Sequence, residues 1–145
     1  DNIRSPVGLA VDGDGRIWVG AAAPNAEPGV LGDVPATRIL RFAPGETPER
    51  VLSTANTGFT FFDVDGAGNL YLPAGRRLLL RRPSGEVDGI AAGFGALRGA
   101  AVSQDGSIWL TDYGRSALYR LVPESDLSMS NGHIVGQSFL HESAP

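Results

Sequence analysis

Cysteine and lysine are both absent from this sequence of 145 residues. Without cysteine, the chain cannot form disulfide bonds, thiolate metal sites or cysteine nucleophiles. All 12 basic residues are arginine, which excludes Schiff-base lysines, Ser-Lys dyads and the lysine of Walker-type phosphate loops. Long hydrophobic runs are missing too, and no segment approaches the roughly 18 apolar residues of a membrane-spanning helix.

Glycine and proline are abundant, with 20 and 10 residues, and leave little room for long helices. Apolar residues make up 42% and charged residues 19%, which suits one packed domain. The net charge of −4 argues against a general nucleic-acid-binding protein. The chain opens on Asp1 without an initiator methionine or a signal peptide, so we expect a processed or partial chain. We also expect an exported protein, periplasmic or extracellular.

Three segments of the chain repeat one pattern. Each contains a β-prone stretch, a turn that ends in glycine, and a second β-prone stretch with an aromatic residue. The segments are residues 7–19, 60–72 and 98–110, with the glycines Gly15, Gly68 and Gly106 and the aromatics Trp18, Tyr71 and Trp109. Because the three aromatics recur in register, we predict that they form core between successive units. The Asp12-Gly-Asp-Gly15 stretch resembles a calcium loop, but its equivalents in the other repeats favour a turn.

Each repeat continues with two more predicted strands. The third strands are expected at residues 37–42, 77–81 and 117–122, and the weaker fourth strands at 50–52, 87–91 and 133–140. Four short antiparallel strands per repeat are the plan of a β-propeller blade. The sequence therefore predicts an all-β propeller with three blades, at about 5–57, 58–95 and 96–143.

The repeats resemble those of NHL, SMP-30 and streptogramin-lyase β-propellers. The resemblance rests on Ser-Pro-Val-Gly-Leu-Ala-Val-Asp at residues 5–12 and Ile-Trp-Leu-Thr-Asp at residues 108–112. It implies a closed ring of about six or seven blades, of which this chain supplies half or part. The expected partners are therefore further blades, from a second copy, another chain or a continuation of this one.

One face of such a propeller collects the connections at residues 21–36, 73–76 and 112–116. Arginines on this face could hold a carboxylate, a phosphate or an acidic partner loop. The candidate ligand-binding residues are Arg76, Arg77, Arg98, Asp112, Tyr113 and Arg115. The alternatives are ordinary solvated arginines that pair with Asp63 or Asp112, and a long first connection that is an insertion without a role.

Lactonase-like members of the resembled family hold a divalent metal at the propeller axis. At the corresponding positions this sequence has Val7, Thr60 and Arg98, none of which is a strong ligand for a hard cation. We therefore expect no cofactor and name no catalytic residue. The leading hypothesis is a non-catalytic binding module that captures a protein or a small anionic ligand.

Two other hypotheses stay open. The first is an enzyme related to SMP-30 gluconolactonases or streptogramin lyases, whose site, with calcium or magnesium, is completed by other blades. The second is an accessory subunit of a larger assembly, whose exposed blade edges pair with neighbours.

Overall fold

The structure is a computed structural model that describes residues 3, 6–22, 36–43, 45–53, 58–123 and 137–142, with residues 123 and 137–142 described by their backbone alone. These residues form three sheets, each of four antiparallel strands. The sheet of blade 1 consists of β1 (Pro6–Val11), β2 (Ile17–Ala21), β3 (Arg38–Phe42) and β4 (Glu49–Ser53).

Blades 2 and 3 repeat this meander. Blade 2 consists of β5 (Asp63–Val64), β6 (Leu70–Ala74), β7 (Arg77–Arg81) and β8 (Val87–Ala92). Blade 3 consists of β9 (Leu97–Val102), β10 (Ile108–Asp112), β11 (Ala117–Pro123) and β12 (Gln137–Glu142), with the short 3₁₀ helix η1 (Tyr113–Arg115) between β10 and β11. No helix in the described residues has the length and apolar character needed to cross a membrane.

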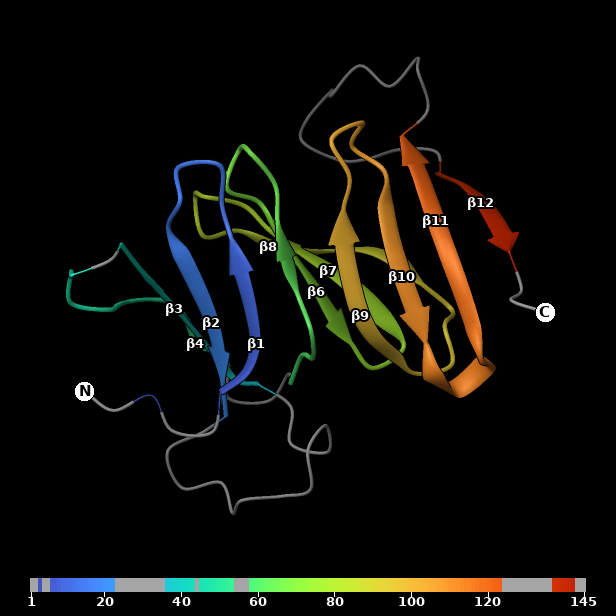
Figure 1. Cartoon of the computed structure of the whole chain (residues 1–145). Helices are drawn as coiled ribbons and strands as arrows, with labels where there is room; N and C mark the ends of the chain where they lie inside the picture. Colours follow the sequence, from blue (N-terminus) through green and yellow to red (C-terminus); the bar gives the residue numbers. More distant parts are fainter. Residues whose placement is uncertain are drawn as a thin grey trace.

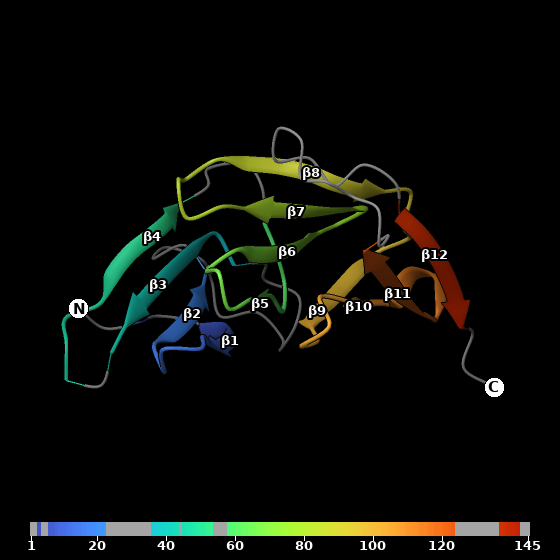
Figure 2. The ribbon, with the colours of Figure 1, turned by 90° about the horizontal axis from the view of Figure 1, so that it is seen from above.

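The three sheets are arranged as neighbouring blades of a propeller. Seen from above, β1, β5 and β9 lie on the inner side of the arc, and β4, β8 and β12 lie on the outer side (Figure 2). The predicted all-β propeller with three four-stranded blades is confirmed. The last predicted strand, residues 133–140, corresponds to β12; residues 133–136 lie outside the described part.

The turn between the first two strands of each blade is built as the repeat predicts. The anchor glycines Gly15, Gly68 and Gly106 have φ angles of 78°, 83° and 80°, a region that favours glycine. In blade 1, one carboxylate oxygen of Asp12 accepts the backbone N–H groups of Asp14 and Arg16, at 3.0 and 2.9 Å. These contacts assign the Asp12-Gly-Asp-Gly15 stretch to a turn.

Alternate residues of each blade face its two neighbours, so the core divides into two interfaces. Between blades 1 and 2, Trp18 packs with Phe62, Val64 and Leu70. Between blades 2 and 3, the packed residues are Tyr71, Leu78, Leu80, Phe94, Leu97, Ile108, Leu110, Tyr119 and Leu121. We call these regions the first and the second interface.

The aromatic residues of the repeat differ in burial. Trp18 and Tyr71 are only 2% and 8% exposed, which confirms their predicted place between blades. The prediction is wrong for Trp109, which is half-buried. Its side chain belongs to the face of blade 3 that points away from blade 2, and none of the described residues forms a fourth blade over it.

The innermost strand of blade 2 is shorter than the repeat predicts. Only Asp63 and Val64 pair with β6. The preceding Phe61 pairs with Gly99 of blade 3 in a parallel bridge, in which the Phe61 N–H donates to the Arg98 carbonyl at 3.0 Å. Phe61 stands where blades 1 and 3 have Gly8 and Gly99, so the chain is diverted toward the neighbouring blade at this point.

Candidate functional site

Three short connections meet at one end of blades 2 and 3, at the lower edge of Figure 1. The N–H of Leu97 donates to the Gly75 carbonyl at 2.7 Å, and the N–H of Tyr113 donates to the Ala96 carbonyl at 2.9 Å. The β6–β7 turn at residues 75–76, the β8–β9 connection at residues 93–96, and η1 are thereby fixed to one another. We call this surface the connection face. Of the first predicted connection, residues 21–36, residues 23–35 lie outside the described part.

Asp112 is buried under the connection face and binds the backbone of the β8–β9 connection. It is 2% exposed, and its two carboxylate oxygens accept the backbone N–H groups of Gly95 and Ala96, each at 2.7 Å. Burial by itself raises the pKa of Asp112, but the hydrogen bonds from Ala96 and Gly95 outweigh burial and hold this pKa below its usual value. Asp112 thus remains a carboxylate and positions the loop that carries Tyr113.

Two glycines let the backbones of this face approach closely. A Cβ atom on Gly114 would lie 2.8 Å from the nitrogen of Ala96, and one on Gly95 would lie 2.9 Å from Asp112 Oδ1 and from Arg115 Cγ. A side chain at position 114 would require a shift of the backbone, and one at position 95 would displace the side chains of Asp112 and Arg115. The packing of η1 against residues 95–96 therefore depends on both glycines.

The other predicted site residues lie on or beside this face. Tyr113 is 76% exposed, and the guanidinium carbon of Arg98 lies 5.6 Å from the centre of its ring, within the range of a cation–π contact. Arg76, Arg77 and Arg115 are exposed. Tyr113, Arg98 and Arg115 come together around η1, and Arg76 joins them through the hydrogen bonds of residues 94–97.

The residues near the inner end of the strands do not fit a divalent cation. The positions at which the resembled lactonases bind metal are Val7, Thr60 and Arg98 in this chain, and a guanidinium repels a cation. Within the described residues, no three acidic or histidine side chains are grouped as metal ligands.

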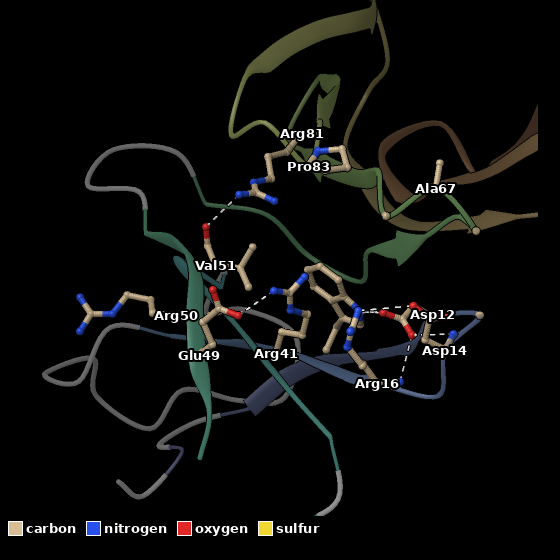
Figure 3. Close-up of a pocket in the computed structure, with 14 residues that line it drawn as sticks. Asp12, Asp14, Arg16, Arg41, Glu49, Arg50, Val51, Ala67, Arg81 and Pro83 are labelled. Atoms are coloured by element: carbon tan, nitrogen blue, oxygen red, sulfur yellow. Dashed lines mark hydrogen bonds and ion pairs between the residues drawn. The ribbon is translucent and has the colours of Figure 1, made fainter. Parts of the chain in front are cut away.

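A cavity lies at the opposite end of the blades from the connection face, beside the hairpins of blades 1 and 2. It has a volume of about 280 Å³ and opens between Arg41 on β3 and Arg81 on β7 (Figure 3). Arg81 donates to the Val51 carbonyl at 3.3 Å, and Arg41 forms an ion pair with Glu49 at 2.6 Å. These residues are not among the candidates predicted from the sequence. The signal was present, because Arg81 is charged where the corresponding residues of the other blades, Phe42 and Leu121, are apolar.

Solved structures of β-propellers superpose on this chain. Virginiamycin B lyase from Staphylococcus aureus matches with a TM-score of 0.64 and 12% identity, over 100% of this chain and 43% of its own. A putative gluconolactonase matches with a TM-score of 0.65 and 14% identity, over 95% of this chain and 48% of its own. The structure described as YCF48 bound to D1 peptide matches with a TM-score of 0.63 and 16% identity, over 98% of this chain and 41% of its own.

The chain thus spans less than half the length of each of these propellers. No protein-family model matches the sequence, and no curated protein matches it. At such low identity the similarity establishes the fold and leaves the activity open. The resemblance to NHL, SMP-30 and streptogramin-lyase propellers is therefore confirmed at the level of the fold.

Proposed function

We propose that this chain is part of a non-catalytic β-propeller that binds a partner through the connection face. The observation that carries this proposal is Tyr113, a large aromatic side chain that is 76% exposed on a loop fixed by hydrogen bonds. Tyrosine and arginine, together with tryptophan, are enriched among the residues that contribute most to the binding energy of protein interfaces. An exposed tyrosine on a rigid loop offers a large contact area at a small cost in conformational entropy.

The charge of this face indicates what it binds. Arg76, Arg77 and Arg115 are exposed, and the guanidinium of Arg98 lies within cation–π range of the Tyr113 ring. The one carboxylate among the candidate residues, Asp112, is buried and bound by backbone N–H groups. The face therefore suits a partner that carries carboxylates, either an acidic protein segment or a small anionic ligand. A propeller of the same fold whose structure contains a bound peptide supports the first.

Capture of the partner by the intact protein tests this proposal. The variant Arg76→Ala/Arg77→Ala/Arg98→Ala/Arg115→Ala is compared with Tyr113→Ala and with the control Arg120→Ala, whose arginine pairs with Asp105 in the β9–β10 hairpin at the other end of blade 3. We expect both connection-face variants to recover much less partner than wild type and the control. Equal recovery by all the proteins would contradict the proposal.

The enzymatic alternative rests on fold similarity to a lyase and a gluconolactonase. It requires that other blades supply the catalytic groups, since the inner-strand positions of the described part do not fit a cation. Metal analysis of the intact protein, together with assays of lactone hydrolysis and streptogramin cleavage, separates the two proposals. Bound metal together with turnover would favour the enzyme. The absence of both metal and turnover would favour the binding module.

We further propose that another blade covers the face of blade 1 that points away from blade 2. Leu9 and Val11 on β1 are 67% and 57% exposed, whereas the equivalent residues of blade 2, Phe62 and Val64, are buried against blade 1. An exposed apolar blade face of this kind is rare in soluble proteins. The covering blade comes from a second copy, another chain or a continuation of this one. A monodisperse, cooperatively melting monomer of the isolated 145 residues, seen by light scattering, would contradict this.

A further inference from the structure

Arg41 occupies a position that the second interface fills with leucine. In blade 1, Trp18 of β2 lies opposite Arg41 of β3. In blade 2, Tyr71 of β6 lies opposite Leu80 of β7 in the same register. Leu80 is 5% exposed and belongs to the core between blades 2 and 3. The blade architecture therefore accepts an apolar residue at the position of Arg41.

Arg81 faces Arg41 from the other side of the first interface and is the exception at its own position of the repeat. Leu70 lies opposite Arg81 in blade 2, and Ile108 lies opposite Leu121 in blade 3. Leu121 is 2% exposed within the core of the second interface. Leu80 and Leu121 thus pack in the core of the second interface. At the corresponding positions of the first interface, Arg41 and Arg81 line a cavity.

The arginine pair is short of negative charge. Glu49 pairs with Arg41, whose guanidinium also lies 5.2 Å from the centre of the Trp18 ring. Arg81 donates to the Val51 carbonyl at 3.3 Å, and its buried Nε has no hydrogen-bond partner among the described residues. Burial, and then the positive charge of Arg41, lower the pKa of Arg81. The negative charge of Glu49 opposes these two effects, but the pKa stays below its usual value.

The other acidic residues of the cavity are already engaged. One carboxylate oxygen of Asp12 binds the hairpin backbone, and the other accepts the Trp18 indole N–H at 2.9 Å. Asp14 pairs with Arg16 at 3.4 Å on the surface. Among the residues lining the cavity, Glu49 is thus the one acid that pairs with either of the facing arginines.

We propose that this cavity binds the phosphate or carboxylate group of a small molecule between Arg41 and Arg81. Guanidinium groups donate paired hydrogen bonds that match the oxygens of such anions, and these bonds strengthen when water is partly excluded. The volume of about 280 Å³ suits a small oxyanion rather than a peptide. The site lies at the hairpin end of blades 1 and 2, away from the connection face, and it is independent of the function proposed above.

Isothermal titration of the intact protein at low ionic strength tests this site, with inorganic phosphate and succinate as separate probes. We expect saturable binding of at least one probe, and the stronger of the two identifies the class of anion. Arg81→Leu should weaken this binding roughly tenfold or more, as expected for the loss of charge-assisted hydrogen bonds. Glu49→Gln should strengthen it, because it removes the carboxylate that competes for Arg41.

The matched control is Arg120→Leu, which removes the same charge from the equivalent position of Arg41 on blade 3, outside the cavity. Its affinity for the probe should equal that of wild type. If Arg81→Leu does not fold, Arg81→Gln takes its place. The absence of binding by both probes, or equal affinity in wild type and the Arg81 variant, would overturn the proposal. Weaker binding in Glu49→Gln would do so as well.

Discussion

The two interfaces between blades share one register but differ in chemistry. In the second, Leu80 and Leu121 face each other within a continuous apolar core. In the first, Arg41 and Arg81 take their places and leave a cavity. Since the same backbone arrangement carries both, the polar pair is not needed to join blades. Packing is therefore set by the apolar positions that both interfaces keep, and the arginines can serve the anion binding proposed above.

The second interface also carries carboxylates that accept backbone N–H groups. Asp63, on the innermost strand of blade 2, accepts the N–H of Val102 in blade 3 at 2.7 Å. Asp112 ties the connection between these blades to β10. In both cases a carboxylate satisfies backbone N–H groups beside the apolar core. In the second interface, buried polar groups are therefore more fully paired by hydrogen bonds than in the first.

The largest effect is expected when the second interface is given the chemistry of the first. Leu121→Arg places a cation without a partner in the core and removes a buried leucine. The expected loss in the free energy of unfolding is about 5 kcal/mol, from the missing apolar contacts and the unpaired charge together. Chemical denaturation of the intact protein measures it. A loss below about 1 kcal/mol would mean that the second interface tolerates polarity as the first does.

The two tryptophans of the repeat test whether another blade continues this pattern of interfaces. Trp18→Ala should cost about 3–5 kcal/mol, the usual range for a buried large aromatic residue. Trp109→Ala should cost as much in the intact protein if a further blade covers blade 3. Thermal melting of the two variants, followed by far-ultraviolet circular dichroism, compares them. A nearly unchanged melting temperature for Trp109→Ala would show that nothing packs on this face.

The carboxylate of Asp112 should make the second interface sensitive to acid. Its pKa is lowered in the folded state, so the unfolded chain binds more protons at acidic pH. This stabilisation is complete above the unfolded pKa of about 3.9 and is lost as the pH falls through the folded value. Asp112→Asn should cost about 1–3 kcal/mol at neutral pH.

Denaturation at several pH values separates this effect from a general loss of packing. The difference between wild type and Asp112→Asn should shrink as the pH falls below about 4. A difference that stays constant across the same range would contradict the assigned role of Asp112. Asp112→Ala controls for the amide of asparagine, which could keep one of the two hydrogen bonds.

Much of the fold could be predicted from the sequence because the repeat records it directly. Gly15, Gly68 and Gly106 adopt a positive φ, and glycine therefore stands at the same position of each repeat. Strand alternation then assigns Trp18 and Tyr71 to the interfaces. The burial of Trp109 was beyond this reasoning, because burial depends on what lies on the far side of a blade, which a repeat pattern does not contain.

The candidate site was less accessible to sequence reasoning. The meeting of Arg98 with Tyr113 depends on a close backbone approach at Gly95 and Gly114, which lie outside the repeat motif. The place of Asp112 beneath the face depends on hydrogen bonds from the connection between blades. Arg81 was detectable as an exception to the repeat. Its significance appears only when Arg41, some forty positions away, is seen to face it.

The smallest effect is expected for the reciprocal change, Arg81→Leu, which gives the first interface the chemistry of the second. The variant removes a half-buried cation whose Nε has no partner among the described residues, and leucine restores the apolar character of this position. Replacing a buried charge with an apolar side chain is often neutral or stabilising. We expect the free energy of unfolding to fall by less than about 1 kcal/mol, or to rise, while anion binding weakens. Denaturation without added anion measures this, since a bound anion would stabilise wild type by mass action. A loss of about 3 kcal/mol or more would show that Arg81 holds the blades together, and the contrast between the two interfaces would then have to be abandoned.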